Sequence, residues 1–77
     1  MRVVELPAGE KAPAGADRVI LRRVDQTKYQ VDGALIAAGS IKLFGQEIYQ
    51  SEQDALLAAL EWARKHAAKT VFIERRL

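Results

Sequence analysis

The chain has 77 residues, of which 49% are hydrophobic and 29% are charged, and this composition predicts one small globular domain spanning residues 1–77. It contains no cysteine and a single histidine, His66, so disulfides, thiolate zinc sites and metal sites built from several histidines are excluded. The formal charge is only +2, and no apolar stretch approaches the roughly 20 residues of a membrane-spanning helix, so we expect no membrane contact.

The first seventeen residues predict a short strand followed by a flexible loop. Aliphatic side chains dominate residues 2–6, whereas residues 7–17 hold both prolines and two of the five glycines. Proline removes a backbone hydrogen-bond donor and glycine raises the entropy cost of ordering, so a loop is expected there. The amino terminus lacks the long apolar run of a signal peptide, and we expect a cytoplasmic protein.

The next part of the chain has the pattern of an antiparallel β-meander. Residues 18–24 are β-branched, aliphatic and partly alternating, Asp25-Gln26 predicts a turn, and residues 28–31 alternate with period two. The Asp32-Gly33 pair that follows is typical of a two-residue type I′ turn, in which both central positions need a positive φ. It predicts a hairpin in which Val31 lies opposite Ala34.

A second hairpin is predicted at Gly45-Gln46, because a type II′ turn requires glycine at its first central position. The short apolar segments on either side would then pair with each other. In this hairpin Leu43 would face Ile48, whereas Phe44 would lie on the other face, as a second contact surface or as an exposed aromatic residue.

The segment from about residue 51 to residue 68 predicts a helix. Ser51 followed by Asp54 is close to a capping box, and no glycine or proline interrupts the alanines and leucines that follow. At about 100° per residue, one stripe of this helix gathers the apolar side chains that are expected to cover a sheet. These side chains are Leu56, Ala59, Leu60, Ala63 and Ala67.

The end of the chain, residues 70–75, predicts a strand, because β-branched and aromatic residues dominate its first half. The predicted fold class is therefore α+β. It consists of an antiparallel β-meander of about four to six short strands packed against one α-helix, with the C-terminal strand returning to the sheet.

The charged residues do not form a pattern that catalysis would use. Three aspartates stand where turns favour this residue, and capping explains the acids at the start of the predicted helix. No carboxylate pair is left over for acid–base chemistry, and no glycine-rich phosphate loop is present. We therefore expect a protein that is not an enzyme and that uses no cofactor and no metal ion.

Apolar and basic residues instead indicate an interaction surface. Trp62 and His66 lie one helical turn apart, so they would either form a shelf for a ligand or cover the edge of the core and the helix end. The candidate surface comprises Phe44, Trp62, His66, Phe72, Arg75 and Arg76. It predicts a small regulatory or accessory domain that binds a protein partner or associates with itself as a homodimer.

Weak nucleic-acid binding is the alternative hypothesis. Residues 62–77 carry five basic residues against one acid, Glu74, and aromatic side chains nearby could stack on bases. However, Arg22 and Arg23 are neighbours on a predicted strand and must point to opposite faces, and the net charge is small. The sequence therefore favours a protein partner over a nucleic acid.

The order of the predicted elements also resembles that of a known family. A strand meander followed by Ser51-x-x-Asp54-Ala55-Leu56, a helix and a last strand is similar, over about the last half of the chain, to small bacterial regulatory domains of the HicB antitoxin kind. The resemblance implies a β-rich regulatory domain with one helix. The glycine-rich strand motif of those domains is missing here, so the resemblance does not assign the chain to that family.

Overall fold

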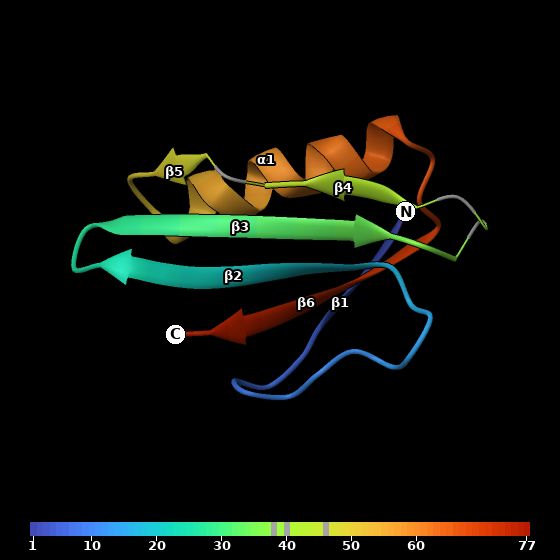
Figure 1. Cartoon of the computed structure of the whole chain (residues 1–77), viewed down its shortest axis with the longest axis horizontal. Helices are drawn as coiled ribbons and strands as arrows, with labels where there is room; N and C mark the ends of the chain where they lie inside the picture. The colour runs from blue at the N-terminus through green and yellow to red at the C-terminus, as the bar shows by residue number, and fades with distance from the viewer. Residues whose placement is uncertain (38, 40, 46) are drawn as a thin grey trace.

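The computed structural model describes residues 1–37, 39, 41–45 and 47–77, and in these residues a sheet carries one helix on one of its faces (Figure 1). The predicted α+β fold, with one helix and a C-terminal strand that joins the sheet, is confirmed. The strands are β1 (Arg2–Glu5), β2 (Arg18–Asp25), β3 (Lys28–Leu35), β4 (Lys42–Phe44), β5 (Ile48–Tyr49) and β6 (Thr70–Arg76), and the helix is α1 (Glu52–Lys65).

The strands of the sheet follow the order β1-β6-β2-β3-β4, with β5 pairing to β3 as well. β3 is antiparallel to β2, β4 and β5, as expected for a meander, whereas β6 runs parallel to both of its neighbours, β1 and β2. The helix explains this difference, because α1 carries the chain back along the sheet before β6 begins (Figure 1). A strand that follows such a crossover runs parallel to the strand before it, here β5. β2 is antiparallel to β3, as β5 is, so β6 is parallel to β2 as well.

The predicted turn at Asp32-Gly33 is wrong. Both residues lie inside β3, where Asp32 pairs with Ile20 and Gly33 pairs with Val19 of β2, and Gly33 has no positive φ. The turn predicted at Asp25-Gln26 is confirmed between β2 and β3, where the Asp25 carboxylate accepts a hydrogen bond of 2.9 Å from the backbone N–H of Thr27. Pairing along both sides of β3 outweighs the local preference of Asp-Gly for a turn.

The second predicted hairpin is also replaced by pairing with β3. Leu43 of β4 lies opposite Ala34, and Ile48 of β5 lies opposite Gln30, so Leu43 does not face Ile48. Gln46 of the predicted turn is outside the described residues. β4 and β5 thus follow one another along the same edge of β3, and together they form the last strand positions on this side of the sheet.

The helix begins as predicted and ends three residues early. Ser51 is the N-cap and its side chain accepts a hydrogen bond from the backbone N–H of Asp54, at 3.1 Å. At the other end Ala67 has a φ of 60°, and the N–H of Ala68 donates to the carbonyl of Ala63. This is the hydrogen bond of a Schellman ending, which stops the helix although no glycine is present.

The core lies between α1 and one face of the sheet. Small residues of the helix, Ala55, Ala59 and Ala63, are fully buried, so the helix backbone lies close to the strands. Leu56 and Leu60 of the predicted stripe are only partly buried and flank this contact. The predicted stripe is therefore shifted by about one residue, and its last member, Ala67, is exposed beyond the helix end. The core residues are Val19, Leu21, Val31, Leu35, Ala55, Ala59, Ala63, Val71 and Ile73.

The loop of residues 7–17, predicted to be flexible, is hydrogen-bonded to β6. Gly9 donates its N–H to the carbonyl of Arg75 at 3.1 Å, and the carbonyl of Asp17 accepts the N–H of Phe72 at 3.0 Å. Ala12 in the middle of the loop is buried. The loop therefore runs along β6, from Arg75 near the end of this strand to Phe72 near its start.

Candidate functional site

Three of the predicted surface residues form an aromatic cluster on the helix side of the sheet. The ring centroids of Phe44 and Trp62 are 5.2 Å apart with an interplanar angle of 30°, and His66 meets the Trp62 ring edge-on at 5.7 Å. Trp62 lies directly over Gly33 of β3, where a Cβ atom would come within 2.5 Å of the indole Cζ3 atom. Glycine at this position lets the indole rest on the strand backbone.

The contact between Gly33 and Trp62 reverses the usual effect of removing a glycine from a strand. Glycine normally weakens a strand, so replacing a strand glycine with alanine is stabilising where nothing lies over it. Because the new methyl group would overlap Trp62, we expect a loss of about 1–3 kcal/mol in the free energy of unfolding, measured by urea denaturation. The loss should disappear when Trp62 is replaced by leucine in the same chain, and an unchanged loss in that background would contradict the contact.

The other three predicted surface residues lie elsewhere. Phe72 is half-buried on the face of the sheet opposite the helix. Arg75 points to the helix side, where it pairs with Glu5 of β1 at 2.8 Å and with Glu52 of α1 at 3.9 Å. Arg76 points to the opposite side, and the six residues are not all gathered into one patch. Their role in binding stays a prediction.

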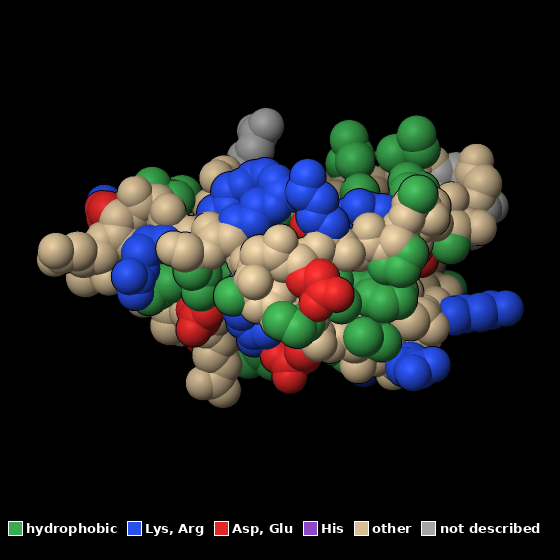
Figure 2. Space-filling view, turned by 90° about the horizontal axis from the view of Figure 1, so that it is seen from below, with side chains coloured by type: hydrophobic (Ala, Val, Ile, Leu, Met, Phe, Trp, Pro, Cys, Tyr) green, Lys and Arg blue, Asp and Glu red, His purple; other side chains and the backbone are tan. Residues whose placement is uncertain are grey.

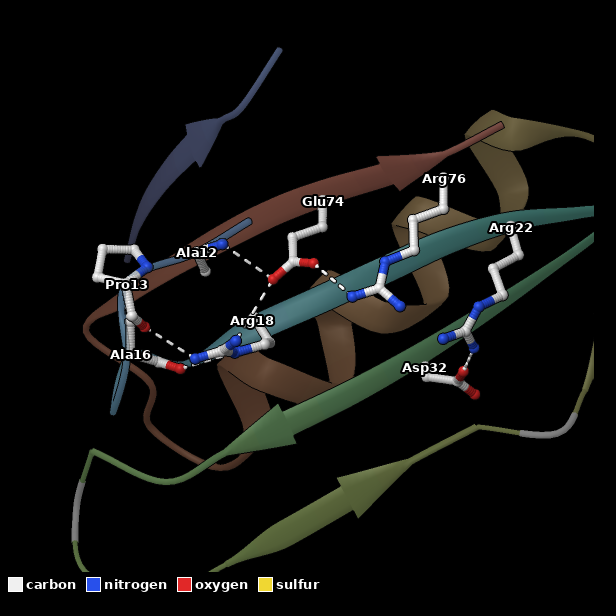
Figure 3. A network of polar contacts seen from close by, with 8 residues as sticks. All are labelled: Ala12, Pro13, Ala16, Arg18, Arg22, Asp32, Glu74 and Arg76. Carbon is white, nitrogen blue, oxygen red and sulfur yellow. Dashed lines mark hydrogen bonds and ion pairs between the residues drawn. The ribbon is translucent and has the colours of Figure 1, made fainter. Parts of the chain in front are cut away.

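A buried carboxylate organises the open face, which we define as the face of the sheet turned away from α1 (Figure 3). Glu74 of β6 is 1% exposed, and its Oε2 atom accepts hydrogen bonds from the Ala12 backbone N–H at 3.0 Å and from Arg18 at 3.4 Å. Its Oε1 atom accepts from Arg76 at 3.1 Å. Arg18 also donates to the carbonyl of Pro13 at 2.8 Å. The network ties β6, β2 and the loop together, and sequence reasoning missed it.

Acids accompany the basic side chains of the open face. Arg22 pairs with Asp32 beside the Glu74 network, so Arg18, Arg22 and Arg76 each contact a carboxylate on this face (Figure 3). Seen from the side at the bottom of Figure 1, Lys and Arg side chains gather in the upper middle of the view, and most of the acidic side chains lie below them (Figure 2). The carboxylates that pair with Arg18, Arg22 and Arg76 reduce the positive charge that phosphate groups would meet on the open face.

At the far end of the sheet, two tyrosines pair across strands. Tyr29 of β3 lies opposite Tyr49 of β5, and both pack against the core. Burial, together with the hydrogen bond that the Tyr49 hydroxyl donates to Glu47 at 3.0 Å, raises the pKa of Tyr49. Tyr49 therefore stays uncharged at neutral pH.

An apolar hollow opens beside β4 on the open face. Ile20 of β2, Ala34 of β3 and Leu43 of β4 line it, and its volume is about 380 Å³. Leu43 is 74% exposed and Ile41, just before β4, is 73% exposed. β4 ends the strand order on this side, and within the described residues no strand pairs with its outer edge. The hollow draws on three strands, so no short sequence pattern could have revealed it.

The described part of the chain contains neither a cluster of metal-ligating side chains nor a membrane-crossing helix. It has no group of three or more His, Cys, Asp or Glu side chains that could hold a metal ion. It has no helix that combines the length and the hydrophobicity of a membrane crossing. The cytoplasmic location stays a prediction.

No protein-family model, no curated protein and no solved structure matches the chain. The resemblance to HicB-type domains thus has no support from these comparisons. A function has to be argued from the surfaces of the domain itself.

Proposed function

We propose that this domain is a non-catalytic protein-interaction module that binds an extended segment of another chain beside β4. The observation that carries the proposal is the exposure of Leu43 and Ile41, both more than 70% accessible, at the edge of the sheet. An edge strand offers unpaired backbone N–H and C=O groups, and apolar side chains on it favour association.

The hollow beside Leu43 gives this edge a means of selecting its partner. In strand addition, backbone hydrogen bonds supply affinity and pockets for alternate side chains supply specificity. An apolar side chain of the added segment would enter the space between Ile20, Ala34 and Leu43. The Arg22–Asp32 ion pair on the same face would favour a polar residue next to it.

The first test is the molar mass in solution, measured by light scattering over a wide range of protein concentration. If the bound segment belongs to a second copy, the mass should rise with concentration. Leu43→Lys should weaken this association about 10- to 100-fold, because a buried leucine contributes roughly 1.5–3 kcal/mol and lysine protects an edge.

Leu57→Lys is the matched control, since Leu57 is an exposed leucine (55%) on α1, away from the edge. It should leave the association unchanged. A chain that stays monomeric would point to a different protein as the partner, and photo-crosslinking from position 43 in extracts of the source cell should then capture a protein that position 57 does not. A monomer without any adduct specific to position 43 would contradict the proposal.

Binding to a nucleic acid receives less support. The ion pairs of Arg18, Arg22, Arg75 and Arg76 reduce the positive charge that phosphates would meet. Titration of single- and double-stranded oligonucleotides at two salt concentrations decides this alternative, because phosphate contacts weaken as salt rises. Salt-sensitive binding would favour the nucleic acid over the protein partner.

A further inference from the structure

A second pocket lies at the end of the sheet where α1 stops, away from the β4 hollow. Its volume is about 520 Å³, which is within the range of small-molecule sites. It is formed by parts of the chain that are far apart in sequence: the end of the loop, the end of β3, the start of β4 and the segment from α1 into β6.

The wall of this pocket is largely apolar. Leu35 is a core residue with 6% exposure, and Phe72 presents an aromatic ring on the open face of β6. Alanines of the loop and of the segment after α1 complete the lining. The wall therefore suits a flat or aliphatic body rather than a sugar or a polyol.

The charged groups of the pocket leave it with a positive balance. Lys42 and Lys69 line it, and in the part of the chain that the structure describes neither makes an ion pair. Asp17 also lines it, but its Oδ1 atom accepts the backbone N–H groups of Ile36 at 2.6 Å and Ala37 at 2.8 Å. These two donors hold the carboxylate in place and offset its charge.

The end of the helix does not reverse this balance. Carbonyl groups at a helix C-terminus normally attract cations. Here the carbonyls of Trp62, Ala63 and Arg64 accept backbone N–H groups from the residues that end the helix. Each of these carbonyls thus already accepts one hydrogen bond, whereas the charges of Lys42 and Lys69 are not paired in the described part of the chain.

We propose that this pocket binds a small organic anion, a carboxylate with an apolar or aromatic body. The body would lie against Leu35 and the alanines that follow α1, Ala67 and Ala68, and the carboxylate would be directed towards Lys42 and Lys69. This inference does not depend on the proposed role of the β4 edge, because the pocket and the β4 hollow share no lining residue, and Lys42 of β4 is on the face opposite to Leu43.

The test uses three probes of one shape and different charge: phenylacetate, its neutral amide and phenethylamine. Amide NMR spectra at about 0.15 M salt should show saturable shifts near Ala37, Lys69 and Phe72 with phenylacetate. Lys69→Met should weaken phenylacetate about tenfold and leave the neutral amide unchanged. His66 lines the pocket and touches the Trp62 ring, so tryptophan fluorescence gives a second measure of binding.

Lys65→Met is the matched control, since Lys65 is exposed on the last turn of α1 and does not line the pocket. It should leave the affinity for phenylacetate unchanged. Three results would overturn the proposal: no shifts near the pocket with any probe, tighter binding of phenethylamine than of phenylacetate, or equal losses from Lys65→Met and Lys69→Met. The second result would mean that Asp17 governs the pocket.

Discussion

Replacing Glu74 with alanine is expected to lower the free energy of unfolding by about 3–5 kcal/mol. Glu74 is 1% exposed and contacts two arginines and a backbone N–H group. The substitution would leave the buried Ala12 N–H without its acceptor and would remove the carboxylate that balances Arg18. Urea denaturation of the variant and the parent chain measures the difference.

Glu5→Ala is the matched control for this change. Glu5 is also a strand glutamate paired with an arginine, but its side chain is 63% exposed. An exposed ion pair contributes little, so the control should lose less than about 1 kcal/mol. Equal losses in the two variants would mean that the burial of Glu74 does not matter. Faster amide exchange in residues 7–17 of the Glu74 variant would show that the network also holds the loop.

The second large effect is expected from Leu21→Ala, which should lower the free energy of unfolding by about 2–5 kcal/mol. Leu21 is fully buried in β2, where it pairs with Val31 and faces the alanines of α1. The side chains around Leu21 cannot fill the resulting cavity unless α1 moves towards the sheet. A chain of this size has a stability near the lower end of roughly 5–15 kcal/mol, so the variant would be largely unfolded at moderate urea concentrations.

Leu57→Ala provides the comparison for Leu21. Leu57 is 55% exposed on α1, and alanine has the higher helix propensity, so the change should stay within about 0.5 kcal/mol. The same denaturation experiment applies to both variants. A small loss for Leu21→Ala, comparable to that of Leu57→Ala, would contradict the packing of α1 on β2 and β3.

The candidate site was only partly predictable from the sequence. Trp62 and His66 were identified as neighbours because helical spacing fixes their distance, and the structure brings Phe44 to the same cluster. The β4 hollow, the Glu74 network and the pocket at the helix end were not found. Each of them joins residues from at least three segments, so their formation depends on strand order and register.

The sequence by itself determined the elements whose stability comes from neighbours along the chain. The helix from Ser51 onward is an example, because its cap and its alanines act within a few residues. Partial alternation of apolar and polar residues likewise predicted β2, and β-branched and aromatic residues predicted the last strand, β6. Interactions of this range can be read from residue types and spacing alone.

Only the tertiary structure decided how these elements are used. Asp32-Gly33 favours a turn locally, but pairing with β2 and β4 and the contact with Trp62 keep it inside a strand. Glu74 is an acid within a strand, and three hydrogen-bond donors allow its burial. Arg76 is close in sequence, whereas Arg18 and the Ala12 backbone N–H are distant. Contacts between distant segments outweigh local preferences here, because burial of side chains and pairing of whole strands involve more free energy than one turn.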